Sequence, residues 1–287
     1  MGSDPISLSV TLAAARARLV AAGIRPDEAA VDVDVYATTI LGWDRATLLQ
    51  NLRQATPAAL EPRFSEWIAR REHREPTAYI VGSREFWGRQ FVITSAVLVP
   101  RPETELIVEE ALARLRAFAE PRIADIGTGS GILAVTLAAE VPGARVTATD
   151  LSSDALEVAK QNAERHDVDR RITFVNTSYL DAVPSTFHLI VANPPYVRDG
   201  DKSALARDVR HEPDMALFGG PDGLRDVTGV LDAAAEKLTP GGWFVMEFGY
   251  GQEDDVRRLV HARRALRFDH VRNDLQGIAR TAIIQKP

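Results

Sequence analysis

The sequence predicts an α/β protein, in which a doubly wound sheet of seven strands follows a small helical domain. Two observations predict this class. From about residue 106 to the end, apolar strand-like segments alternate with segments of helical spacing. A glycine-rich loop follows the first of these strands, which is where doubly wound folds bind their ligands. Before residue 76, in contrast, apolar residues recur only at helical spacing.

Changes of composition divide the chain into three segments. Residues 1–75 contain only helical patterns and nearly balanced charges, which indicates a small helical bundle that binds a protein surface or packs on its neighbour. In the first case it would be a helical substrate-binding domain. Residues 76–105 are rich in aromatic and β-branched side chains, and Gly88 is expected to be the turn of a β-hairpin linker. Residues 106–287 hold the sheet. Its strands are expected at residues 123–126, 145–149, 172–175, 189–192, 243–247, 268–271 and 279–284.

The composition is that of an ordinary globular protein, with 45% hydrophobic and 26% charged residues. No apolar run approaches the roughly 18 residues of a membrane span, so no membrane partner is expected. The net charge of −6 argues against broad binding to a nucleic-acid backbone. The chain has no cysteine and no leader-like apolar segment at its start, which favours the cytoplasm.

The glycine-rich loop is Gly127-Thr128-Gly129-Ser130-Gly131, between the first strand and a helix. Glycines let the backbone turn tightly and approach a ligand closely. The spacing is not that of the dinucleotide fingerprint, because Ile132 stands where its third glycine would fall. Asp150 ends the second strand, where a carboxylate can accept both hydroxyls of a ribose; its alternative role is a helix N-cap.

A second polar loop, Asn193-Pro194-Pro195-Tyr196, follows the buried strand 189–192. Two prolines fix two φ angles and remove two backbone donors, which leaves a rigid pair of acceptors in the Asn193 side-chain oxygen and the Pro194 carbonyl. Such a pair beside the ring of Tyr196 suits a planar NH₂ group, as in an amide or a nucleobase amine. The alternative for Asn-Pro-Pro alone is an ordinary turn.

With these loops and several other motifs, the chain resembles the release-factor glutamine methyltransferase family, which are S-adenosylmethionine-dependent protein-(glutamine) methyltransferases. The resemblance extends from the helical domain to the C-terminus. The other motifs are Arg101–Glu105, Glu212-Pro213, Gly219–Leu224, Glu247–Gly249, Gln252 and Asp274–Gly277.

The resemblance implies a Rossmann-like methyltransferase sheet and assigns roles to single residues. Gly127 to Gly131 would hold the methionine part of S-adenosyl-L-methionine, Asp150 its ribose and Tyr179 its adenine, with Asn193 beside both cofactor and substrate. Ser178 departs from the family, because that position is often acidic and receives the adenine amino group. Ala279 likewise replaces a frequent acidic residue.

The chemistry implied is methyl transfer to the glutamine amide of the Gly-Gly-Gln motif in class I peptide-chain release factors. Asn193 and Pro194 would each accept one N–H of that amide, and Tyr196 would pack on its plane, with Pro195 shaping the loop. Neither a strong general base nor a metal is expected. Three other readings stay open: an adenine methyltransferase of nucleic acid, a ribosomal-protein glutamine methyltransferase, and a non-catalytic cofactor-binding module.

Overall fold

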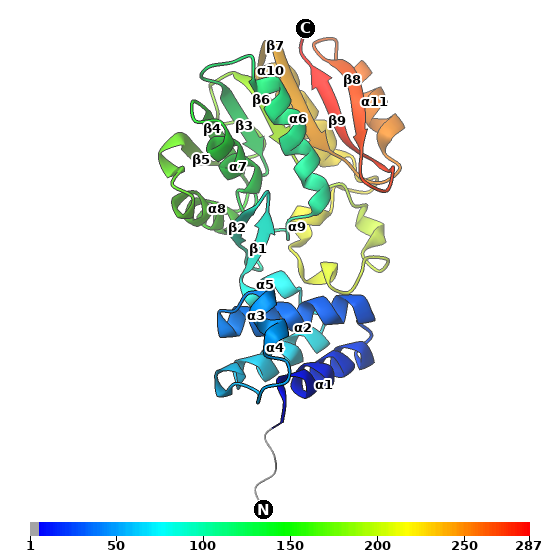
Figure 1. The fold of residues 1–287 in the computed structure, drawn as a ribbon. Helices are drawn as coiled ribbons and strands as arrows, with labels where there is room; N and C mark the ends of the chain where they lie inside the picture. Colours follow the sequence, from blue (N-terminus) through cyan, green and yellow to red (C-terminus); the bar gives the residue numbers. More distant parts are fainter. Residues whose placement is uncertain (1–5) are drawn as a thin grey trace, which may run out of the picture. The chain divides into compact units, whose positions relative to one another are not determined.

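The computed structural model describes residues 6–287, which form two compact units (Figure 1). The first unit extends to Gly82 and also includes Arg207–His211, and the second comprises Ser83–Ala206 and Glu212–Pro287. Residues 1–5 of the expected helical domain lie outside the described residues. The helical unit continues beyond residue 75 because a further short helix contributes Ile80 to its core.

The described part of the first unit is built of helices, with one isolated β-bridge between Ser7 and Ala55. Its helices are α1 (Leu8–Ala21), α2 (Pro26–Leu41), α3 (Arg45–Gln50), α4 (Arg63–Glu72) and α5 (Thr77–Val81). The apolar sides of α1, α2 and α4 meet in one core, which the sequence specifies by its helical spacing of apolar residues. Within this core Tyr36 and Trp67 pack edge to face with their ring centroids 5.6 Å apart.

A buried ion cluster holds the distant segment Arg207–His211 in the helical unit. Arg71, only 2% exposed, donates from Nε to Asp32 at 2.7 Å and from Nη1 to Asp208 at 2.7 Å, and it also pairs with Glu28. Arg74 donates to the other oxygen of Asp208 at 2.7 Å. The helical unit therefore includes a segment that lies more than a hundred positions after its last helix in the sequence.

The second unit is built on a seven-stranded sheet in the order β5-β4-β3-β6-β7-β9-β8. The first five of these strands are parallel, and β9 runs antiparallel between β7 and β8. Their bounds are β3 (Arg122–Ile126), β4 (Arg145–Asp150), β5 (Ile172–Asn176), β6 (Phe187–Ala192), β7 (Leu238–Glu247), β8 (Arg267–Asn273) and β9 (Ala279–Gln285). The predicted fold class is confirmed. β7 begins five residues earlier than expected, with a break in its register against β6.

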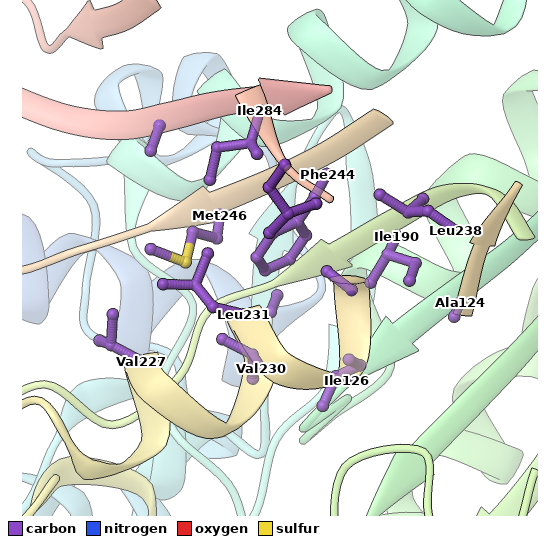
Figure 2. Close-up of a cluster of buried hydrophobic side chains, with 14 of the residues drawn as sticks. Ala124, Ile126, Ile190, Val227, Val230, Leu231, Leu238, Phe244, Met246 and Ile284 are labelled. Carbon is purple, nitrogen blue, oxygen red and sulfur yellow. The ribbon is translucent and has the colours of Figure 1, made fainter. Parts of the chain in front are cut away.

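Helices cover both faces of the sheet. They are α6 (Glu105–Leu115), α7 (Ile132–Glu140), α8 (Ser153–Arg165), α10 (Arg225–Lys237) and α11 (Glu253–His261), with the short α9 (Asp214–Leu217) in the connection after β6. α6, α7 and α8 pack side by side, and α10 and α11 pack together over the opposite face. Figure 2 shows that face, where Val227, Val230 and Leu231 of α10 lie against Ile190, Phe244 and Met246 of the sheet.

The predicted hairpin consists of β1 (Ser83–Phe86) and β2 (Arg89–Val92), and Gly88 has a φ of +67° in its turn. It belongs to the second unit rather than to a separate linker. Asn162 of α8 exchanges two hydrogen bonds with the Val92 backbone, at 2.7 and 3.0 Å, and also donates to the Ser130 carbonyl at 2.8 Å. One buried amide thus ties the hairpin to the glycine loop.

No helix within residues 6–287 combines the length and the apolar character that crossing a bilayer would require.

Candidate functional site

A pocket opens at the carboxyl ends of β3, β4 and β6. Strand order reverses between β3 and β6, and doubly wound sheets bind ligands at such a point. The walls come from the glycine loop, the ends of β4, β5 and β6, the segment before α6, and α9 and α10. The lining includes Ala96–Leu98, Pro100, Arg101, Thr104, Gly127–Ser130, Asp150–Ser152, Thr177–Tyr179, Asn193–Pro195, Met215, Ala216 and Asp226. Most of the predicted site residues therefore meet in one place.

The three glycines of the loop adopt backbone conformations that other residues rarely adopt. Gly127, Gly129 and Gly131 have φ values of +70°, +54° and +81°, which side chains disfavour. Gly127 and Gly129 line the pocket, and a Cβ at either would meet open space. Gly131 instead packs beneath the loop, where a Cβ would lie 3.1 Å from Ala159 of α8. Gly131 thus allows the start of α7 to approach α8 closely, and it does not line the pocket.

Asp125 supports the glycine loop from inside the protein. Its Oδ2 accepts hydrogen bonds from the Thr128 hydroxyl at 2.6 Å and from the Ala134 backbone at 3.0 Å. Within the described residues its Oδ1 has no partner, although the side chain is buried. Burial raises the pKa of Asp125 to about 7, and the nearby charge of Asp150 acts in the same direction. The Asp125 carboxyl group therefore changes its charge near neutral pH.

This pKa predicts a pH dependence of stability. The folded state holds the Asp125 proton more tightly than the unfolded state does. The contribution of this proton to the free energy of unfolding is therefore complete below about pH 4. It is lost as the pH rises through about 7. Between pH 6 and 8 the loss should be about 1.4 kcal/mol. Asp125→Asn, which cannot titrate, should show a correspondingly smaller decrease in unfolding free energy across that range. Chemical denaturation at several pH values measures it, and parallel curves for the two proteins would contradict it.

Asp150 connects the end of β4 to the glycine loop. Its Oδ2 accepts the Gly129 backbone N–H and its Oδ1 the Ser152 backbone N–H, each at 2.9 Å. Burial raises its pKa. The helix N-cap of α8 is Ser152, whose hydroxyl accepts from Ala155, so the capping role considered for Asp150 belongs to another residue. The carboxylate lines the pocket beside the loop.

Replacing Asp150 should weaken binding of a nucleoside ligand. We expect Asp150→Ala to cost about 1–3 kcal/mol of affinity for S-adenosylmethionine, because charge-assisted hydrogen bonds are lost. Asp154→Ala, in the exposed first turn of α8, is the matched control and should bind normally. Calorimetry compares the two, and equal affinities would remove Asp150 from the binding site.

The far wall of the pocket contains Tyr179, which has a φ of +45°. Its hydroxyl donates to Asp226 Oδ1 at 3.0 Å, and burial raises its pKa to about 12. The ring lies across Gly229 of α10, where any Cβ would fall 2.1 Å from Cζ. Sequence reasoning did not find Asp226, which places a carboxylate in the same wall as Ser178.

Asn193 and Pro194 present free acceptors to the pocket. Asn193 Nδ2 donates to the Thr104 hydroxyl at 3.2 Å. Among the described residues nothing donates to Asn193 Oδ1 or to the Pro194 carbonyl. Both residues line the pocket, and so does Pro195. The arrangement can hold a planar NH₂ group by its two hydrogens.

Tyr196 has a different position from its three predecessors. Its hydroxyl donates to Glu247 Oε1 at 3.0 Å, and the residue is not part of the pocket wall within the described chain. Burial, followed by the neighbouring charge of Glu247, raises the pKa of the Tyr196 hydroxyl. Its stacking on a substrate amide stays a prediction. The hydrogen bond to Glu247 attaches the loop to the end of β7.

Two buried polar residues that carried no assigned role hold this loop. Glu247 at the end of β7 accepts from Tyr196 and, at 2.7 Å, from Thr104; burial raises its pKa. Gln252 accepts from Gly249 N at 2.8 Å and donates to the Tyr196 carbonyl at 3.1 Å. Both residues fall in motifs that the sequence shares with the family, Glu247–Gly249 and Gln252, but a motif does not reveal which residues pair.

The fold and the site define a methyltransferase, and comparison with known proteins agrees. A model described as "Methyltransferase small domain" matches residues 103–217, and one described as "PrmC N-terminal domain" matches residues 11–82. The release factor glutamine methyltransferase of Bradyrhizobium diazoefficiens is 40% identical over 99% of this chain and 97% of its own length. That of Cereibacter sphaeroides is 42% identical over 96% and 97%. The chain belongs to the release factor glutamine methyltransferase family.

Solved structures show the same fold at low identity. The hMettl16 catalytic domain, in complex with MAT2A 3′UTR hairpin 1, superposes with a TM-score of 0.57 at 16% identity. The match covers 82% of this chain and 84% of that domain.

Proposed function

We propose that the protein transfers a methyl group from S-adenosylmethionine to the side-chain amide nitrogen of the glutamine in the Gly-Gly-Gln motif of class I release factors. The observation that carries this proposal is the pair of free acceptors, Asn193 Oδ1 and the Pro194 carbonyl, in the pocket that also contains the glycine loop. Donor and acceptor of the methyl group can thus meet in one cavity.

The residues present fit S-adenosylmethionine. Gly127 and Gly129 leave backbone exposed without side chains, which suits the amino-acid end of the ligand. The Asp150 carboxylate lies beside them for the ribose, and the wall of Tyr179 and Asp226 offers a ring and an acceptor for the adenine. When bound, this ligand supplies a methyl group on a positively charged sulfur, which makes the methyl carbon a good electrophile.

The protein's part in the reaction is to position the amide. An amide nitrogen is a poor nucleophile because its lone pair is shared with the carbonyl. Asn193 Oδ1 and the Pro194 carbonyl would each accept one N–H, directing the nitrogen at the methyl carbon. Alignment of this kind can lower a barrier by roughly 7–11 kcal/mol. The two acceptors also stabilise positive charge as the new C–N bond forms and the methyl–sulfur bond breaks. The nitrogen then loses a proton to water.

The helical unit supplies the second contact that a protein substrate needs. A Gly-Gly-Gln loop tip buries little surface, so its recognition requires another part of the release factor. The helical unit, which matches the family's N-terminal domain, is the surface we assign to that task. We place the reaction in the cytoplasm, where release factors act in translation termination. Direct binding to nucleic acid is not part of the proposal.

The test offers intact release factor, ribosomal proteins and DNA in parallel, each with labelled S-adenosylmethionine. Mass spectrometry then locates the methyl group. We expect label on the glutamine of the Gly-Gly-Gln motif. Label on an adenine of DNA, or on a ribosomal-protein glutamine with none on the release factor, would overturn the assignment.

A further inference from the structure

A chain of hydrogen bonds runs from the interior of the second unit to the catalytic loop. Glu247, 2% exposed, accepts the Tyr196 hydroxyl at 3.0 Å on one oxygen and the Thr104 hydroxyl at 2.7 Å on the other. Thr104, 1% exposed, in turn receives the Asn193 amide N–H at 3.2 Å. These residues come from three separate parts of the sequence, and nothing in the reaction requires Glu247 or Thr104 to touch a ligand.

The donor and acceptor roles along this series of hydrogen bonds are determined by Glu247, at its buried end. With Glu247 ionised, its two oxygens can only accept, so the single hydroxyl proton of Thr104 is directed at Oε2. The Thr104 oxygen is then left as an acceptor, and it can pair with the NH₂ side of Asn193 but not with its oxygen. The Asn193 amide is thereby held with Oδ1 toward the pocket. Rotated by half a turn, it would present two donors to a substrate that also brings donors.

We propose that Thr104 and Glu247 are positioning residues that fix the orientation of the Asn193 side-chain amide, and that Tyr196 is bound by the same carboxylate to hold the loop. This inference rests on the proposed acceptor role of Asn193. It assigns the Thr104 hydroxyl, in the pocket wall before α6, a function in the rate of methyl transfer that acts through the Asn193 side chain.

The test is Thr104→Val, which removes the hydroxyl and keeps the shape of the side chain. Freed from Thr104, the Asn193 amide can turn, and the single-turnover rate should fall about 5- to 20-fold, the effect of one lost hydrogen bond. Affinity for S-adenosylmethionine should not change. Thr104→Ser, which keeps the hydroxyl, should restore most of the rate.

Two controls separate positioning from a general structural effect. Thr136→Val makes the same substitution at a fully buried site whose hydroxyl has no partner within the described residues, and it should react normally. In the background of Asn193→Ala, Thr104→Val should cause no further loss, because the amide through which it acts is absent. The assay uses tritium-labelled S-adenosylmethionine and whichever acceptor the unaltered protein labels.

The outcomes are distinct. A protein that labels no release factor would refute the proposed function, and the Thr104 series could still be read with the acceptor it does label. A normal rate for Thr104→Val would overturn the inference, as would an equal loss in the Asn193→Ala background. A loss of cofactor affinity with Thr104→Val would overturn it too, since that would indicate a structural role.

Discussion

Asn193→Ala is expected to lower the rate of methyl transfer by roughly 10²–10³, while the fold and most of the cofactor affinity remain. The variant removes one of the two acceptors that we propose hold the substrate amide, and the loss of one preorganised electrostatic contact has effects of that size. Because Pro194 is unchanged, the backbone of the loop and its second acceptor stay in place. The defect should therefore lie in kcat and leave the KM for S-adenosylmethionine nearly unaltered.

Single-turnover kinetics with saturating cofactor measure this rate directly. Asn273→Ala, an exposed asparagine at the end of β8, is the matched control and should behave like the unaltered protein. A near-normal rate for Asn193→Ala would show that the amide is not held by that side chain.

Arg71→Met should destabilise the helical unit by about 3–5 kcal/mol. Methionine fills similar space but cannot compensate the charge of Asp32, and removing one partner from a buried ion pair leaves uncompensated charge. Asp208 keeps its ion pair with Arg74. Hydrogen exchange is the appropriate measurement, because it reports the local opening of each helix and strand separately. Protection should fall in α2 and α4 and remain in β3 and β6.

Arg18→Met is the control for this variant. Arg18 forms a bidentate pair with Glu72 in the same unit, but it is exposed, and such surface pairs contribute about 0–1 kcal/mol. If the two variants lost protection to the same small degree, the buried cluster would contribute little to stability. An increase in protection for Arg71→Met would mean that apolar packing serves better than the ion cluster at this site.

The sheet and the two loops could be predicted because their determinants are local. The central strand β6 contains the apolar run 189–192 between His188 and Asn193, and each glycine of the loop marks a backbone with positive φ. The roles of Asp150 and Asn193 followed from their positions directly after strands, where parallel strands deliver side chains to a common edge. The structure gathers both in one pocket, and the assignment of what they bind remains the proposal above.

The supporting residues could not be predicted, because their partners are distant in sequence and buried. Thr104 and Glu247 are 143 positions apart, and although both fall in motifs of the family, neither motif indicates that the two residues pair. Asp226 lies in the first turn of α10, a helix whose apolar side has regular spacing. Nothing in that spacing indicates that Asp226 faces the pocket. Gly229 is explained only by the Tyr179 ring that crosses it.

The segment Arg207–His211 has a consequence for building chimaeras. The polypeptide passes between the units after Gly82, after Ala206 and after His211, so the helical unit is encoded in two pieces. A graft that exchanged only the N-terminal 82 residues would remove Arg71 and Arg74 and leave Asp208 without the two arginines that pair with it. Exchanging the helical unit between family members therefore requires both pieces to be transferred together.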